Sequence, residues 1–343
     1  MMTKYPKVSV IILNWNGKYL LKDCFQSLQR IDYPDYELIM VDNGSQDGSI
    51  EYVKQNFPDV RILALDRNYG YAEGNNLGAS IAKGELLVFL NNDTCVDKNW
   101  LIELVKPILE DSKIAICGSK VVYYNHPEII EFAGGMILSN GMAIHVDLPE
   151  QEGYNYNIPR YTSHAYGAAM LIRRDIFQRL NGFDEDYFIY NEELDLCWRC
   201  WLLGLRVLFV PSSVMFHKQT GPQLLEWERI YYAQSNHIRN ILKNFNFVNA
   251  IKALLLTLGF DMYKMIKHTY KRKYRNIKAI LGGYFDVLRD LNQTLKKRKF
   301  IQSNRQISDK ELMQLGLIAP LKNSVEIIFK RSKLKRRGSL DLK

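Results

Sequence analysis

Residues 7–17 read KVSVIILNWNG, an apolar run rich in β-branched side chains that ends in a polar, glycine-containing segment. A run that is apolar at nearly every position is typical of a strand buried on both faces of a parallel sheet. The polar segment that starts at Asn14 then lies at the carboxyl end of this strand. The stretch therefore predicts the first strand of an α/β sheet with polar side chains at its end.

The alternation of apolar strand and amphipathic helix continues along the first 210 residues. Such alternation predicts right-handed βαβ units and a mainly parallel, Rossmann-like sheet flanked by helices. Further strands are predicted at Tyr36–Val41, Val60–Leu65, Glu85–Leu90, Tyr166–Arg173 and Arg206–Val210. Helices are predicted at Tyr19–Gln29, Ser49–Asn56, Gly74–Lys83 and Asp175–Leu180, and from Glu192 onward. Residues 113–165 are expected to be irregular, with a weak hairpin signal around residues 139–141.

The net charge of +9 on the 343 residues hides two parts of opposite sign. Residues 1–243 hold 23 basic and 30 acidic side chains, a net charge of −7, whereas residues 244–343 hold 23 basic and 7 acidic side chains, a net charge of +16. This division argues against a uniformly basic protein that coats nucleic acid, and no nucleic-acid-binding motif accompanies the charge. We predict an α/β body over residues 1–245, followed by a basic tail.

The lack of a recognisable targeting signal and the pattern of the cysteines predict a cytoplasmic protein. The apolar stretch Val8–Leu13 is too short for a signal peptide, and no window of about 18 apolar residues predicts a membrane span. The five cysteines are odd in number and scattered, which argues against a disulfide framework. Cys197 and Cys200 form a single CxxC pair, which we interpret as reduced and packed because a structural zinc site needs four ligands.

Polar residues also follow two further predicted strands, at the ends where ligands bind in parallel sheets. Asp42 begins the stretch DNGSQDGS, whose other residues are well explained by a turn and a helix cap. The carboxylate of Asp42 is able to accept the N3–H of a uracil or thymine ring. Residues 91–93 read NND, and a carboxylate at this position suits a divalent cation that already holds a diphosphate. Residues 68–78 carry Asn75 and Asn76 between spaced glycines, which let a helix approach a strand or a nucleotide closely.

Acidic and aromatic side chains are interleaved in residues 182–199, GFDEDYFIYNEELDLCWR. Glu192, Glu193 and Asp195 crowd the start of a predicted helix, where the helix dipole stabilises carboxylates. Like charges and apolar neighbours raise carboxylate pKa values, as a general base requires. His217, which follows the strand that begins at Arg206, is either a metal ligand or a hydrogen-bonded histidine.

Taken in order, six stretches resemble family 2 glycosyltransferases, which have the GT-A fold, and in particular the rhamnosyltransferase-like branch that builds bacterial cell-surface glycans. They are VSVIILNWNG, VDNGSQDGS, NYGYAEGNNLGA, LNNDT, GAAMLIRRDIF and GFDEDYFIYNEELDLCWR. The resemblance covers residues 7 to about 221. The resemblance implies a GT-A type α/β fold. It also implies inverting transfer of a sugar, with rhamnose as one candidate, from a nucleotide-diphosphate donor to a glycan or polyprenyl-diphosphate-linked acceptor.

The resemblance also implies roles for individual residues. Asp42 would meet the donor base, and Asp93 would bind Mg²⁺ or Mn²⁺ together with His217. Glu193 would be the catalytic base, and its possible alternates are Glu192 and Asp195. The remaining donor-binding residues would be Asn14, Asn75, Asn76, Asn91 and Asn92. Two departures are evident: Asn91 replaces the first acid of the metal-binding triplet, and Glu193 stands where aspartate is more usual.

Two other functions remain open from sequence. Asn91 would permit a non-catalytic, sugar-nucleotide-binding scaffold of a glycan assembly complex. A sugar nucleotidyltransferase would need a glycine-rich, basic phosphate loop near the amino terminus, and Leu13–Lys18 is a poor match to one.

The basic tail contains apolar residues at helical spacing over residues 251–266 and 277–295, with basic clusters at residues 271–275 and 296–299. Basic amphipathic helices lie flat on anionic membranes, so we expect residues 246–300 to hold the protein on the inner face of the cell membrane. The alternatives are packing on the catalytic body or in a homo-oligomer. Residues 301–343 are expected to be a basic C-terminal tail.

Overall fold

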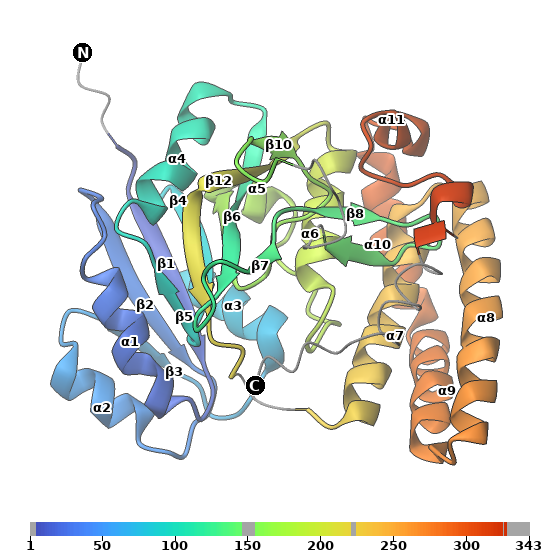
Figure 1. Cartoon of the computed structure of the whole chain (residues 1–343), viewed down its shortest axis with the longest axis horizontal. Coiled ribbons are helices and arrows are strands. Elements are labelled where there is room, and N and C mark those ends of the chain that lie inside the picture. The colour runs from blue at the N-terminus through green and yellow to red at the C-terminus, as the bar shows by residue number, and fades with distance from the viewer. Residues whose placement is uncertain (1–4, 146–154, 221–223, 325, 328–343) are drawn as a thin grey trace.

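The structure is a computed structural model that describes residues 5–145, 155–220, 224–324 and 326–327. Its central sheet contains β1 (Val8–Asn14), β2 (Tyr36–Asp42), β3 (Arg61–Ala64), β4 (Leu86–Asn91), β5 (Thr94–Val96), β6 (Ile114–Tyr123), β7 (Ile130–Phe132), β10 (Arg160–Tyr161), β11 (Ala169–Arg173) and β12 (Arg206–His217). The strand order is β10-β12-β6-β11-β4-β1-β2-β3, with β5 paired to β12 and β7 to β6 (Figure 1). A separate hairpin is formed by β8 (Gly135–Ile137) and β9 (Ala143–His145).

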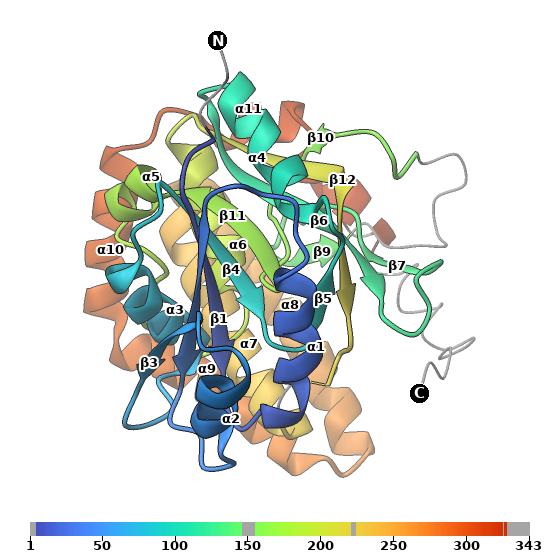
Figure 2. The same cartoon turned by 90° about the vertical axis from the view of Figure 1, so that its left-hand side faces the viewer.

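The helices surround this sheet. Those of the first 202 residues are α1 (Lys18–Leu28), α2 (Ser49–Asn56), α3 (Gly70–Ile81), α4 (Trp100–Glu110), α5 (Arg174–Arg179) and α6 (Glu192–Leu202). Those that follow are α7 (Glu226–Asn244), α8 (Phe247–Tyr270), α9 (Tyr274–Arg289), α10 (Leu291–Ser303) and α11 (Asp309–Gln314). Figure 2 shows α1 and α2 in front of the sheet and the later helices behind it.

The mainly parallel sheet predicted from the sequence is confirmed. β1 pairs in parallel with β2 and β4, β2 pairs in parallel with β3, and β6 pairs in parallel with β12. β11 runs antiparallel between β4 and β6. The pairing aligns Asn14 with Asp42 and Leu13 with Asn91, so the carboxyl ends of three neighbouring strands meet at one edge of the sheet.

The apolar run of β1 is explained by burial on both faces. Val10 and Ile12 belong to a core on the side of α1 and α4, which includes Trp100. Ile11 belongs to a second core on the side of α3, α5 and α6, which includes Trp198. Because successive side chains of a strand point to opposite faces, both sets must be apolar when both faces are covered.

The prediction that residues 113–165 are irregular is wrong for β6, a ten-residue strand at the centre of the sheet. Gly118 and Ser119 interrupt its apolar pattern, and each has a packing role. A Cβ on Gly118 would come within 2.7 Å of the Cβ of Ala165, and the hydroxyl of Ser119 lies 3.0 Å from that of Ser213. The hairpin predicted around residues 139–141 is confirmed by β8 and β9.

The helices after β12 form a bundle beside the sheet. α7 contacts α6, α8, α9 and α10, and Arg239 on α7 forms a buried ion pair with Asp286 on α9 at 2.8 Å. The boundary near residue 245 therefore falls between helices that pack together. No helix in the described ranges has both the length and the apolar character needed to cross a membrane. Part of the predicted basic tail, residue 325 and residues 328–343, lies outside the described residues.

Candidate active site

The carboxyl ends of β1, β2 and β4 are joined by the side chain of one buried residue, Asn14. Its Nδ2 donates hydrogen bonds to Oδ2 of Asp42 at 3.0 Å and to Oγ of Ser45 at 3.2 Å. Its Oδ1 accepts a hydrogen bond from Nδ2 of Asn92 at 2.8 Å. Gly17 packs over this group, and a Cβ there would lie 2.2 Å from Nδ2 of Asn92. The network fixes Asp42 and Asn92 relative to each other.

A cavity of about 140 Å³ opens at this edge of the sheet. It is lined by Leu13, Trp15, Asn43, Asn68, Gly70, Tyr71, Asn91, Asn92, Asp93, Phe188, Ile189 and Leu224. Asn43 shapes one wall, because its Nδ2 donates to Oδ1 of Asn68 at 2.8 Å and to the carbonyl of Gly70 at 3.0 Å. Gly70 has a φ of +80°, and a Cβ there would lie 2.4 Å from the carbonyl oxygen of Phe188.

Asp93 and His217 lie together beside this cavity. Nε2 of His217 is 3.3 Å from Oδ1 of Asp93, and its Nδ1 is 2.9 Å from Oε2 of Glu131. The hydroxyl of Tyr166 donates to the other oxygen of Glu131 at 2.6 Å. The pairing of β5 with β12 places Thr94 opposite His217, which explains how residues so distant in sequence meet.

The two carboxylates set the charge of His217. Burial alone would lower its pKa, but hydrogen bonds to Asp93 and Glu131 outweigh burial and raise the pKa to about 10. The same contact with His217 lowers the pKa of Glu131 against the effect of burial. Without a bound cation, the imidazole therefore carries a proton between two carboxylates.

The donor atoms at this site fit a divalent cation. An aspartate oxygen and an imidazole nitrogen suit Mn²⁺, and a ligand histidine commonly directs its other nitrogen to a carboxylate, as His217 does toward Glu131. Within the described ranges, no group of three or more His, Cys, Asp or Glu side chains is arranged to hold a metal ion. Asp93 and His217 would thus supply two ligands, leaving the others to phosphate oxygens and water.

Glu192 and Glu193 begin α6, and Glu193 lies close to a residue of the cavity wall. A Cβ placed on Gly167 would lie 3.6 Å from both Cδ of Glu193 and Oη of the cavity residue Tyr71. Glu192 is 4% exposed, and its Oε2 has no hydrogen-bond partner among the described residues. Burial raises the pKa of both carboxyls, and the adjacent Glu193 raises that of Glu192 further.

Tyr166 connects the two groups of acids. Its pKa is raised first by burial and then by the carboxylates of Glu131, Glu193 and Asp93. The Tyr166 ring is therefore within electrostatic reach of both the candidate metal residue Asp93 and the candidate base Glu193.

Asp195 has a different environment from Glu192 and Glu193. It is fully buried and forms ion pairs with Arg199 at 2.7 Å and with Lys243 at 2.9 Å. Lys243 also contacts Asp184, which pairs in turn with Lys297 on α10. Burial would raise the pKa of Asp195, but Arg199 and Lys243 lower it. These contacts join α6 to the bundle, so Asp195 anchors the helix that carries Glu193.

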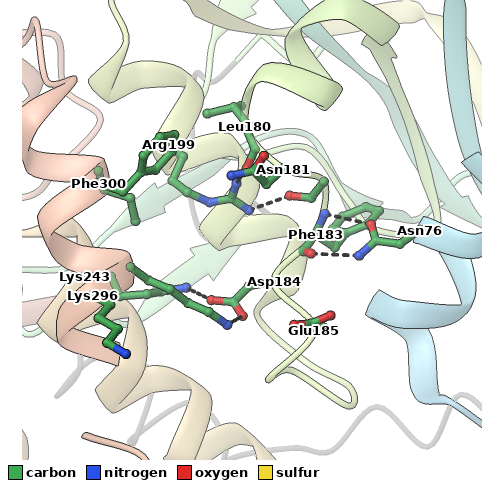
Figure 3. Close-up of a pocket in the computed structure, with 13 residues that line it drawn as sticks. Asn76, Leu180, Asn181, Phe183, Asp184, Glu185, Arg199, Lys243, Lys296 and Phe300 are labelled. Carbon is green, nitrogen blue, oxygen red and sulfur yellow. Dashed lines mark hydrogen bonds and ion pairs between the residues drawn. The ribbon is translucent and has the colours of Figure 1, made fainter. Parts of the chain in front are cut away.

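A cavity of about 520 Å³ lies beside this ion-pair network (Figure 3). Its lining includes Asp184, which pairs with Lys243, and Arg199, which pairs with Asp195, and it contains neither Asp93 nor Glu193. Figure 3 also shows Asn76 bound to Phe183 through both polar atoms, at 2.8 and 2.9 Å. The smaller cavity at the strand ends, which contains Asp93, is therefore the candidate site.

Sequence reasoning named some of these residues and missed others. Asp93, Asn91 and Asn92 line the cavity, whereas Asn75 is buried nearby with its Nδ2 donating to the carbonyl of Tyr71 at 2.9 Å. The missed residues are Asn43, Tyr71, Glu131 and Tyr166. Asn43 follows Asp42 directly, so its position at the end of the same predicted strand could have identified it. Glu131 lies in a region without a recognisable pattern, so no local signal identified it.

A family model for Glycosyl transferase family 2 matches residues 9–180, half of the chain. The chain belongs to glycosyl transferase family 2. The match includes all three strand ends of the cavity and Asp93, while Glu193 and His217 follow it. It does not distinguish the rhamnosyltransferase-like branch from others.

Two similar curated proteins and one solved structure illustrate this relationship. The chain is 31% identical over 228 residues to the O-antigen biosynthesis protein RfbC of Myxococcus xanthus, covering 63% of the chain and 18% of that protein. It is 24% identical over 344 residues to N-acetylgalactosaminyltransferase 4 of Drosophila melanogaster, covering 95% of the chain and 51% of that protein. The chain thus spans about half or less of these relatives. The mannosyltransferase PcManGT of Pyrobaculum calidifontis, solved with GDP-Man and Mn²⁺, shares the fold with a TM-score of 0.55 and 16% identity, over 84% of this chain and 88% of that one.

We expect Lys243→Met to lower the free energy of unfolding by about 3–5 kcal/mol, because it leaves Asp184 and Asp195 buried with one cation fewer. Chemical denaturation of the purified chain measures the loss. Lys106→Met is the matched control, since Lys106 pairs with Glu103 while its own side chain is 48% exposed, and should cost at most about 1 kcal/mol. Equal losses in the two variants would show that the buried network does not hold the helices together.

Proposed function

We propose that this protein is an inverting glycosyltransferase that moves a sugar from a nucleotide-diphosphate donor to a hydroxyl of a glycan acceptor. The observation that carries the proposal is the cavity at the strand ends, which is lined by Asp93, the partner of His217, and by Tyr71, which lies with Glu193 against Gly167. This arrangement suits a reaction in which charge develops on a leaving diphosphate while a proton leaves an acceptor hydroxyl. Membership of the family supports the reaction class.

Donor binding follows from the strand ends. Asp42 is held by Asn14 and by the backbone N–H of Ser45 at 2.9 Å, which leaves some of its carboxylate lone pairs for the N3–H of a pyrimidine base. Asn91 and Asn92 lie at the cavity, where their amides are able to donate to sugar or phosphate oxygens. Asn14, Asn75 and Asn76 are engaged with the protein and would act by positioning these walls.

The diphosphate would lie at Asp93 and His217. A divalent cation held there, Mg²⁺ or Mn²⁺, would neutralise the negative charge of the leaving group. Asp93 supplies a carboxylate with one oxygen toward His217, and Glu131 holds the imidazole in orientation through Nδ1. The solved mannosyltransferase with the same fold contains Mn²⁺ and GDP-Man, which is consistent with this placement.

Glu193 would act as the general base. The acceptor O–H bond breaks and its proton passes to Glu193, while the oxygen forms a bond to the anomeric carbon. The bond from that carbon to the diphosphate oxygen breaks on the opposite face, and its electron pair leaves with the nucleotide. The transition state is oxocarbenium-like, as in glycoside hydrolysis. The raised pKa of Glu193 makes it a stronger base than an exposed glutamate.

Glu193 is the stronger candidate among the three acids at the start of α6. It is the more exposed member of the pair with Glu192, and it lies against Gly167 beside Tyr71. Asp195 is occupied by Arg199, Lys243 and Asn244. Proton transfer from an acceptor requires a carboxylate that the acceptor is able to reach.

The acceptor would be a cell-surface glycan under construction on a polyprenyl-diphosphate lipid. One relative is named an O-antigen biosynthesis protein, which supports this class of acceptor. Rhamnose is the first donor sugar to test, in keeping with the resemblance of the sequence motifs. Such an acceptor would place the protein on the inner face of the cell membrane.

We expect Glu193→Gln to lower kcat for sugar transfer by about 10²–10⁴ while the affinity for the nucleotide is unchanged, because only proton abstraction is lost. Glu192→Gln is the matched control and should retain more activity. In the wild type, kcat should fall as the pH drops through the raised pKa of Glu193, and this limb should be absent from the variant. Product formation measured against pH tests both points. A Glu193→Gln enzyme with wild-type turnover would exclude Glu193 as the base.

Asp93→Asn removes a charge and keeps the shape of the side chain. We expect it to weaken the binding of the nucleoside diphosphate at least tenfold when Mn²⁺ is present and to leave binding in EDTA unaltered. Titration calorimetry with and without Mn²⁺ provides the comparison. Asp97→Asn, on the loop after β5, is the control and should behave as the wild type. If Mn²⁺ strengthens nucleotide binding equally in Asp93→Asn and the wild type, the cation binds elsewhere.

A further inference from the structure

The outer surface of α8 and α9 exposes an apolar stripe on each helix. On α8 these residues are Ile251, Leu255, Leu258, Met262 and Ile266, between 43% and 69% exposed; on α9 they are Leu281, Phe285 and Leu288, between 53% and 69% exposed. We call these eight residues the hairpin face. In Figure 1, α8 and α9 lie at the edge of the molecule farthest from β2.

α8 buries small or polar side chains, namely Ala250, Ala253, Thr257 and Asp261, and exposes several large apolar ones. α9 buries Ile280 and Val287 together with Ala279 and Gly283, yet Leu281, Phe285 and Leu288 stay exposed. A helix that packs only within its own protein normally directs its large apolar side chains inward. Exposed apolar surface of this kind marks an interaction site.

The charges around the hairpin face are positive. Exposed basic residues of the two helices and their turn are Lys252, Lys264, Lys267, Lys271, Arg272, Lys273, Arg275 and Lys278. The only acid between residues 247 and 285 is Asp261. Asp261 is fully buried and accepts hydrogen bonds from Gln234, Lys264 and Tyr284. Residues 247–285 thus combine apolar side chains with cations and offer no exposed carboxylate, while Glu226 at the start of α7, whose side chain is 50% exposed, pairs with Lys273 of the turn.

We propose that the hairpin face lies in the headgroup region of an anionic bilayer, with the basic turn at residues 271–275 bound to lipid phosphates. Apolar burial and attraction of lysine and arginine to anionic headgroups act together in such surfaces. Pairing of this face with the same face of a second copy would place the exposed cations of the two hairpins against one another, with no exposed acid on residues 247–285 of either copy to offset them. The charge distribution therefore favours the bilayer as the occupant.

The structure narrows the membrane-binding region that the sequence predicts. α10 carries the basic cluster at residues 296–299, but Lys297 is directed toward the body, where it pairs with Asp184 and with Asp186 at 2.7 Å. The α10 cluster is therefore not equivalent to the basic turn. The docking surface is the α8–α9 hairpin, not the whole of residues 246–300.

The basic turn is also close in the fold to the mouth of the strand-end cavity. Lys273 in the turn forms a 2.7 Å ion pair with Glu226 at the start of α7. Leu224, two residues earlier, lines the cavity. A bilayer that holds the hairpin would thus lie at the same end of the molecule as the reaction site, which suits a lipid-borne acceptor. This last point rests on the proposed function, whereas the docking itself does not.

Sedimentation of the full chain with lipid vesicles tests the proposal. We expect binding to vesicles that contain phosphatidylglycerol, weaker binding at high salt, and little binding to pure phosphatidylcholine. Leu255→Gln/Leu258→Gln/Ile266→Gln should weaken binding at least tenfold. Its matched control is Leu315→Gln/Leu321→Gln, which changes leucines that are 51% and 52% exposed outside the hairpin face and should bind as the wild type.

A second pair of variants tests the charges. Lys271→Gln/Arg272→Gln/Arg275→Gln should weaken binding roughly a hundredfold, from the attraction expected for three surface cations. Lys22→Gln/Lys310→Gln/Lys322→Gln removes three exposed cations elsewhere and should have a much smaller effect. All four variants should bind nucleoside diphosphate as the wild type does, which separates loss of docking from loss of the reaction site.

Three results would overturn the proposal. One is a wild type that sediments with neither kind of vesicle, and another is an apolar variant that binds as the wild type does. The third is a dimer in analytical ultracentrifugation that the apolar variant dissociates, which would show that a second copy occupies the hairpin face.

Discussion

The side chain of Asn14 holds the reaction site together, because one buried amide joins the carboxyl ends of three adjacent strands. It donates to Asp42 on β2 and to Ser45, and it accepts from Asn92 just beyond β4. Buried polar groups are costly unless they are hydrogen-bonded, so such an amide fixes the strand ends in one arrangement. The position of Asp93 follows from that arrangement, and so does the pairing of Asp93 with His217 on β12.

The two sides of the cavity depend on opposite electrostatic conditions. At Asp93, a histidine between two carboxylates concentrates polar groups that suit a cation and a diphosphate. At the start of α6, burial and the proximity of two glutamates favour the uptake of a proton. Ion pairs through Asp195 and Lys243 anchor α6 against α7, so the later helices also hold the helix that carries the candidate base Glu193. The bundle therefore supports the candidate site and also carries the hairpin face.

The sequence was most informative where local pattern and position in the fold coincide. The run of β1 predicted a doubly buried strand, and the polar residues after β1, β2 and β4 predicted a site at the sheet edge, because parallel strands bring their ends together. Contacts between distant segments were not predictable. Glu131 comes from a short strand in a region whose sequence predicts no regular structure. The strand β6 was not predicted because Gly118 and Ser119, whose roles depend on tertiary packing, interrupt its apolar pattern. Asp195 was listed with Glu193 from spacing alone, but its partner Lys243 lies 48 residues away.

Release of nucleoside diphosphate tests the central claim most directly. The full chain would be incubated with a panel of UDP-, GDP- and dTDP-sugars, a polyprenyl-diphosphate-linked glycan fraction, and Mg²⁺ or Mn²⁺. The account predicts release from one donor class, in step with transfer of its sugar to the glycan, and loss of release on addition of EDTA. Binding of a donor at the strand-end cavity without release under any of these conditions would contradict a transferase and would instead indicate a sugar-nucleotide-binding scaffold.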